Sequence, residues 1–195
     1  MIMSLPRQPW VLAFLGIFAC LVGLVPSQAQ DEAKSRRDKL DQLFSSLQAE
    51  KLESNADIIV LEIWRLWGQS GRGDVDRLLA EATDHMRSGA NERALAVLDR
   101  IVELAPDFAE GWNKRATVLY LLDEHDRSLA DIAKVLELEP RHFGAIAGSG
   151  LIAIARGDWK TALAAYRRAL AINPFLKERL ELIPALEEKV KGSPI

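Results

Sequence analysis

Three prolines, Pro106, Pro140 and Pro174, lie 34 residues apart, and each follows a segment of helix-forming residues. Proline lacks a backbone N–H and its ring clashes with the preceding turn, so a helix ends at or just before it. A helix therefore ends once in every 34-residue period, which is long enough for two helices joined by a turn. Because no convincing strand pattern is present, the predicted fold class is all-α, with repeated helix pairs.

Small and bulky side chains recur at the same positions of each period when Val75, Ala109 and Phe143 are counted as position 1. Positions 8 and 20 are small, so the helices of a pair can approach closely, and positions 4 and 24 are bulky and fill the space between them. These residues are Ala82, Ala116 and Gly150 at 8, Ala94, Ser128 and Ala162 at 20, Leu78, Trp112 and Ile146 at 4, and Leu98, Ile132 and Tyr166 at 24. The predicted helix pairs are 74–88 with 91–104, 108–122 with 125–138, and 142–156 with 159–172.

This pattern resembles the tetratricopeptide-repeat (TPR) family, which has Trp or Leu at position 4, small residues at 8 and 20, an aromatic residue at 24 and proline at 32. The chain departs from the family at position 7, where Glu81 and Arg115 replace an apolar residue, and at position 11, where His85 replaces tyrosine. The resemblance implies a TPR α-solenoid of stacked antiparallel helix pairs with N- and C-terminal capping helices. Its three units occupy residues 74–174, in register as 75–108, 109–142 and 143–176.

The segments that flank the repeats are also expected to be helical. An amphipathic helix is predicted at 34–51 from apolar residues at the i, i+3, i+4 and i+7 spacing, and the apolar run 56–67 predicts a second helix. We interpret residues 30–73 as a divergent repeat-like hairpin that caps the N-terminal end of the array. Residues 175–195 are interpreted as a C-terminal capping helix and tail, which Pro184 is expected to kink or split.

The first 29 residues have the composition of a secretory signal peptide. Arg7 is the only charged residue among them, the stretch Trp10–Val25 is apolar, and small residues precede the expected cleavage after Ala29. This predicts export to the periplasm. Two alternatives stay open: the segment is retained as an inner-membrane anchor, although its 16 apolar residues are fewer than the roughly 20 that a span needs, or Cys20 is lipidated.

No catalytic or metal-binding set emerges from the sequence. His85, His125 and His142 lie on three different helices or turns, and the mature chain has no cysteine to join them. Gly148-Ser149-Gly150 lacks the second glycine and the preceding strand of a nucleophile elbow. The net charge of −3 and the absence of a basic element argue against nucleic-acid binding. We therefore expect no enzymatic activity, no cofactor and no metal.

The resemblance implies instead that the first helix of each pair lines a concave, peptide-binding groove. Repeat positions 2, 5, 9, 12 and 13 would face it, and they grade from polar in the first unit to apolar in the third. The candidate groove residues are Arg87, Asn113, Thr117 and Tyr120, which would orient a peptide, and Leu151 and Ile154, which would accept its apolar side chains. Only Asn113 fits the carboxylate clamp that some members of the family use.

Two further contacts are predicted from the register. Arg115 and Asp131 are expected to pair, because an arginine at a normally buried position needs a partner. Trp64 and Trp67 are expected to seal the N-terminal hairpin against the first unit; the alternative is an exposed aromatic docking site.

The amino-acid sequence of residues 109–117 and 139–145 is similar to that of exported TPR proteins of alphaproteobacteria. The expected function is that of a non-enzymatic periplasmic adaptor, which binds a protein or an extended peptide in cell-envelope assembly or integrity. One alternative is a membrane-tethered assembly factor that presents clients such as apocytochromes or division proteins, and a remote one is a cell-wall hydrolase. Membrane contact is expected only through an uncleaved N-terminal segment, and the oligomeric state is not predicted.

Overall fold

The computed structural model of the 195-residue chain describes residues 27–192. The predicted signal peptide, apart from its last three residues, lies outside the described residues, as does Cys20. Within 27–192 the chain forms nine α-helices and one short 3-10 helix, η1, without strands. None of the helices in this range combines the length and the apolar character needed to cross a membrane. The predicted all-α fold is confirmed.

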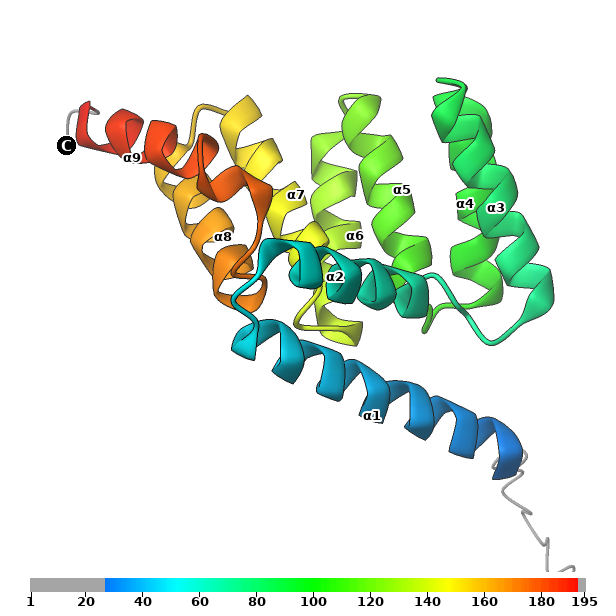
Figure 1. Cartoon of the computed structure of the whole chain (residues 1–195). Helices are drawn as coiled ribbons and strands as arrows, with labels where there is room; N and C mark the ends of the chain where they lie inside the picture. The colour runs from blue at the N-terminus through cyan, green and yellow to red at the C-terminus, as the bar shows by residue number, and fades with distance from the viewer. Residues whose placement is uncertain (1–26, 193–195) are drawn as a thin grey trace, which may run out of the picture.

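The three predicted repeat units are present and stand side by side (Figure 1). Each consists of two antiparallel helices, and their bounds lie within two residues of the predicted ones: α3 (Gly73–Arg87) with α4 (Asn91–Leu104), α5 (Ala109–Leu121) with α6 (His125–Leu138), and α7 (Phe143–Ala155) with α8 (Trp159–Ile172). The second helix of each pair ends two residues before its proline. The proline period therefore predicted the ends of these helices correctly.

The turn within each pair places repeat position 15 in the left-handed region of backbone space. Gly89 and Gly157 have φ of 74° and 72°, and Asp123 has φ of 59°. Glycine adopts this conformation without a steric penalty, and aspartate tolerates it better than most residues.

Packing between the helices of a pair follows the small-to-bulky pattern. In the third unit Tyr166 is buried, and a Cβ atom on Gly150 would lie only 2.7 Å from its ring carbon Cε2. Glycine at position 8 is therefore required by tyrosine at position 24. In the second unit Trp112 packs against the core while remaining half-buried, and its Nε1 donates to the carbonyl of Pro106.

The predicted pair between Arg115 and Asp131 is confirmed. Nε and Nη2 of Arg115 donate to the two carboxylate oxygens of Asp131 at 2.7 and 2.8 Å. Nη1 also donates at 2.9 Å to Asp99 on α4, in the preceding unit, and the guanidinium lies 4.8 Å from the centroid of the Trp112 ring. The arginine at position 7 thus joins α4, α5 and α6.

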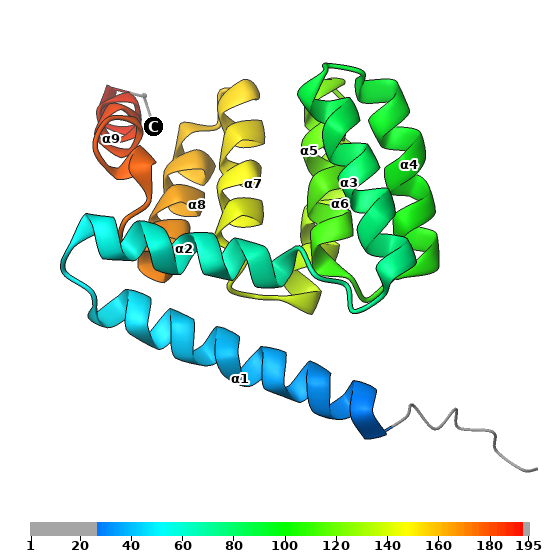
Figure 2. The same ribbon diagram turned by 45° about the vertical axis from the view of Figure 1, so that its right-hand side comes forward.

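The N-terminal hairpin consists of α1 (Ser27–Ala49) and α2 (Glu53–Trp67). Both helices run crosswise to the repeat helices, along one edge of the array (Figures 1 and 2). Their buried residues share one core with α7, α8 and α9, whereas the core of the first unit contains no residue of the hairpin. The expected position of the hairpin at the N-terminal end of the array is therefore wrong.

Trp64 and Trp67 form the predicted seal, but with a different unit. Trp67 stacks on His142 at 4.0 Å between ring centroids, and Trp64 meets Phe143 edge-on at 5.4 Å. His142 caps the N-terminus of α7 and Phe143 is the first residue of that helix, so the expected contact with the first unit is wrong. Polar contacts also fix α1: Asp41 pairs with Arg141 at 2.6 Å, and Gln48 donates to carbonyls at the end of α8.

The C-terminal segment contains η1 (Lys177–Arg179) and α9 (Leu182–Gly192), which packs on α8. Ile183 and Leu186 are buried there, as expected of a capping helix. Pro184 is the third residue of α9, in the first turn, where no intrahelical N–H is needed, so it is accommodated there without splitting the helix.

Candidate binding groove

A depression that we call the trough lies where α2, α5, α7 and the α8–α9 connection meet. Its volume is about 480 Å³. Its lining comes from four parts of the chain: Asp57, Val60 and Trp64 of α2; Thr117 of α5; Phe143, Gly144, Ala147, Gly148 and Leu151 of α7; and Tyr166, Asn173, Phe175, Leu176, Lys177, Glu178 and Leu182 of α8 and the segment after it. The trough therefore combines the repeat array with both flanking segments.

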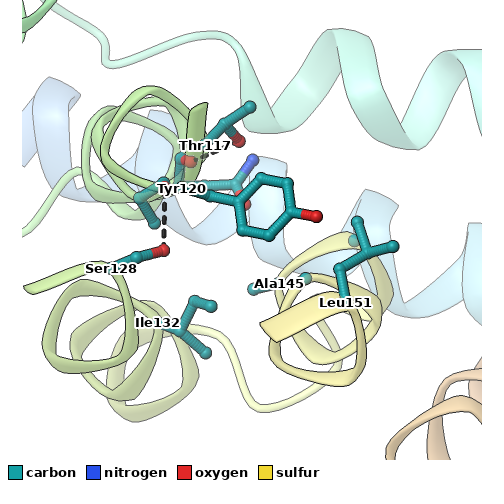
Figure 3. A pocket seen from close by; sticks show the side chains of 10 residues that line it. Thr117, Tyr120, Ser128, Ile132, Ala145 and Leu151 are labelled. Carbon is teal, nitrogen blue, oxygen red and sulfur yellow. Dashed lines mark hydrogen bonds between the residues drawn. The ribbon is translucent and has the colours of Figure 1, made fainter. Parts of the chain in front are cut away.

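A smaller side pocket of about 60 Å³ opens between α5, α6 and α7. It shares Thr117, Gly144, Gly148 and Leu151 with the trough, so the two are continuous. Figure 3 shows the Tyr120 ring extending from α5 toward Leu151, with Ile132 and Ala145 below.

The floor of the trough is α7, whose 13 residues include no charged side chain. Gly144 and Gly148 lie one helical turn apart on α7. A Cβ on Gly144 would lie 2.5 Å from Cη2 of Trp64, whereas one on Gly148 would meet its nearest neighbour, Cδ1 of Ile132, at 3.6 Å. Gly144 therefore makes room for the Trp64 ring of α2, whereas the surface above Gly148 is open.

The structure brings four of the six predicted groove residues together. Thr117 and Leu151 line both the trough and the side pocket, and Asn113 and Tyr120 line the side pocket. Arg87 lies elsewhere, exposed and paired with Asp84 at 2.7 Å. Ile154 is partly buried against the core that the third unit shares with the hairpin.

Asn113, which lines the side pocket, belongs to a buried hydrogen-bond network with Glu110 and His142. Nδ2 of Asn113 donates at 2.9 Å to the carboxylate of Glu110, which is 3% exposed. His142 is fully buried, and its Nδ1 accepts a hydrogen bond from the backbone N–H of Ala145. Its Nε2 must therefore carry the hydrogen, which it donates to Glu110 at 3.2 Å. The Trp67 ring stacks on the imidazole of His142 and so covers one side of this network.

Sequence reasoning missed that α2 covers part of the groove. Position 2 of the second and third units, Glu110 and Gly144, was expected to face a ligand, but Glu110 is buried and Gly144 lies under Trp64. The available signal was glycine at a groove-lining position together with two tryptophans in the hairpin. Sequence reasoning also missed two exposed apolar residues that lie close to lining residues along the chain, Leu61 on α2 and Leu180 after η1; they are 70% and 69% exposed, and we call them the rims of the trough.

The trough carries few charged groups. Its lining contains two carboxylates, Asp57 and Glu178, and one ammonium group, Lys177. Burial raises the pKa of the Tyr166 hydroxyl to about 12, and the nearby Glu178 carboxylate adds to this shift. No cluster of three or more potential metal ligands exists in the described part of the chain.

Comparison with known proteins identifies the family to which this architecture belongs. Residues 79–141 and 122–176 match the family model of the tetratricopeptide repeat. The chain is 36% identical over 166 residues to a TPR repeat-containing protein of Rhizobium etli, which covers 85% of this chain and 81% of the relative.

Solved structures with the same fold include the first TPR of Spaghetti (RPAP3) bound to the HSP90 peptide SRMEEVD, with a TM-score of 0.58 and 15% identity over 60% of this chain and 94% of that one. The Sgt2 TPR domain from Aspergillus fumigatus matches with a TM-score of 0.56 and 19% identity, over 64% of this chain and 87% of that one. MamA matches with a TM-score of 0.56 and 17% identity, over 82% of this chain and 84% of that one. The repeat pattern, the helix pairs and these matches agree: this chain belongs to the tetratricopeptide-repeat family.

Proposed function

We propose that this protein is a non-enzymatic adaptor that holds a segment of a partner protein in the trough. The TPR fold itself suggests protein–protein interaction. The observation that carries the proposal is the uncharged floor of α7, which together with the exposed rim residues Leu61 and Leu180 leaves apolar surface in water. Exposed apolar surface around a depression is typical of interaction sites.

The ligand is expected to differ from those of the structural neighbours. One neighbour holds the peptide SRMEEVD, which is rich in carboxylates. The trough has two carboxylates of its own against one lysine, and Arg87 lies outside it. A strongly acidic peptide would therefore meet repulsion rather than a basic clamp.

Exchanging one groove residue tests the binding site. Leu151→Asp places a charge on the floor of the trough, and Leu104→Asp is a matched control, because Leu104 is similarly exposed on α4 (43% against 40%) and lines neither cavity. Burial of a leucine stabilises a complex by about 1.5–3 kcal/mol, so partner retention in a quantitative pull-down should fall about tenfold or more for Leu151→Asp only. Equal retention by the two variants would contradict binding in the trough.

We further propose that the protein works in the periplasm and serves the assembly or integrity of the cell envelope. The support is the signal-peptide composition of residues 1–29 and the similarity of residues 109–117 and 139–145 to exported proteins. N-terminal sequencing of the exported protein tests it, with Gln30 expected as the first residue. A mature chain that retains Trp10–Val25 would favour the membrane-tethered assembly factor instead.

A further inference from the structure

The trough has open space beside α2, and its lining restricts what can fill that space; this inference rests on the proposed function. We propose that the occupant is an amphipathic α-helix of a partner protein, which lies beside α2 over the floor of α7. Its apolar stripe contacts the floor and both rims, and a basic residue next to the stripe faces Asp57.

The first argument is the supply of hydrogen-bond partners. A bound extended peptide needs partners for its own N–H and C=O groups, and each one buried without a partner costs about 1–3 kcal/mol. The floor has few to offer: the α7 residues that line the trough, Phe143, Gly144, Ala147, Gly148 and Leu151, carry no polar side chain, and the neighbouring Thr117 hydroxyl on α5 already donates to the carbonyl of Asn113 at 2.9 Å. A helix satisfies its backbone internally, so it can be buried here without that cost.

The second argument is that this face of the array already receives one helix. α2 crosses α7 with the Trp64 ring over Gly144. One turn further along α7, Gly148 also lines the trough, and no aromatic ring comes within 4 Å of the position that its Cβ would occupy. Small residues on a helix allow a second helix to approach closely. The space beside α2 therefore offers a partner helix the kind of surface that α2 itself uses.

The third argument is the pair of apolar rims. On α2, Leu61 lies about one turn from both Asp57 and Trp64, which line the trough, so it projects beside the opening. On the opposite side, Leu180 lies between Glu178 and Leu182, which also line the trough. The apolar stripe of an amphipathic helix covers an arc of about 100° or more. Such a stripe contacts two walls and a floor at once.

The carboxylates of the trough indicate which flank of the partner helix faces α2. Asp57 is exposed on α2 and forms no ion pair with any side chain that the structure describes. Glu178 adds a second carboxylate across the trough, and Lys177 is the one basic residue among the described side chains of the lining. A partner helix with lysine or arginine beside its stripe complements this excess of negative charge, whereas an acidic flank does not.

Residue-level crosslinking in the native host distinguishes these possibilities. The photoreactive amino acid benzoylphenylalanine replaces Leu61, Leu151 or Leu180 in the full-length chain, and Leu104 is the control position outside the trough. We expect adducts to one partner segment from the three trough positions, with the attached partner residues spaced three or four apart. Asp57→Lys should lower the yield from position 61 about threefold, the effect of one exposed ion pair.

Each other outcome overturns part of the account. Partner residues spaced two apart would indicate an extended segment, which refutes the helical occupant and leaves trough binding intact. Adducts between two copies of this chain would make the trough a self-association site, which also refutes the inference. An unchanged crosslinking yield at position 61 in Asp57→Lys would refute the proposed basic residue beside the apolar stripe. Trough adducts no stronger than those from position 104 would refute both the inference and the proposed function.

Discussion

Glu81 and Arg115 occupy the same repeat position in opposite surroundings. Position 7 faces the preceding unit. No unit precedes α3, so Glu81 is exposed and keeps the outer face of the first unit polar. Arg115 faces α4, is 17% exposed, and is held by Asp99 and Asp131. The two departures from the family pattern therefore have separate physical reasons: one ends the array, and the other joins two of its units.

Removing Asp131 should cost far more stability than removing Asp99. The side chain of Asp131 is 6% exposed and makes a two-fold contact, whereas that of Asp99 is 43% exposed and makes one. We expect Asp131→Ala to lower the free energy of unfolding by about 3 kcal/mol, because it leaves a largely buried arginine without its main partner. Asp99→Ala should cost less than about 1 kcal/mol. Urea denaturation measures both; similar losses would show that Asp131 is not the principal partner.

Tyr166 should make stability fall at high pH. Its pKa is raised to about 12, first by burial, while an unfolded tyrosine titrates near 10. A folded pKa above the unfolded one leaves stability intact below pH 10 and removes it between about pH 10 and 12. The loss from this group should reach roughly 2–3 kcal/mol. Tyr166→Phe is the control: its unfolding free energy should fall less over this range, and a parallel fall in both proteins would contradict the assignment.

At the scale of elements, α2 and α7 are fitted to each other through one glycine. Gly144 follows the first residue of α7, and the missing side chain makes room for the Trp64 ring. The same helix carries Gly148, where the nearest neighbour of an added Cβ is at an ordinary contact distance. One helix thus contains a glycine that packing demands and one that packing does not.

The two glycines should respond differently to alanine. Gly144→Ala should lower the unfolding free energy by about 1–3 kcal/mol, since the Trp64 ring has to move. Gly148→Ala should be neutral or raise stability by up to about 1 kcal/mol, because alanine favours a helix over glycine. Thermal unfolding gives both values. Trp64→Leu combined with Gly144→Ala should recover part of the loss, and no recovery would mean that the collision lies elsewhere.

At the scale of the whole molecule, the hairpin breaks the one-dimensional order expected of a repeat array. Repeat units usually contact only their neighbours. Here α1 and α2 share a core with α7, α8 and α9, while the core of the first unit extends only to Phe108 and Val118 at α5. The two ends of the described chain are thereby joined, and α3 and α4 form the end without additional packing.

This arrangement predicts uneven local stability. Native-state hydrogen exchange should show that the amides of α3 and α4 open with a lower free energy than those of α7 and α8. The physical reason is that Phe143 and Tyr166 belong to a core extended by the hairpin and α9. Protection that is equal in the first and third units would indicate that the hairpin adds no stability.

Much of the fold was predictable because its determinants are local. Pro106, Pro140 and Pro174 end helices by their own chemistry, and the register placed Arg115 opposite Asp131. The position of the hairpin was not predictable, because Trp64 and Trp67 indicate burial but not the surface that buries them. The trough depends on that position, so the sequence indicated its lining residues Thr117 and Leu151 and missed the α2 wall.

The placement of α2 beside the trough is the claim on which both the groove and its proposed occupant depend. Nuclear Overhauser contacts of the Trp64 indole protons test it directly in solution. We predict strong cross-peaks from the Trp64 ring to the Hα protons of Gly144, since the ring covers that backbone. Cross-peaks from Trp64 to α3, for example to Leu79, with none to Gly144, would place the hairpin on the first unit and contradict the account.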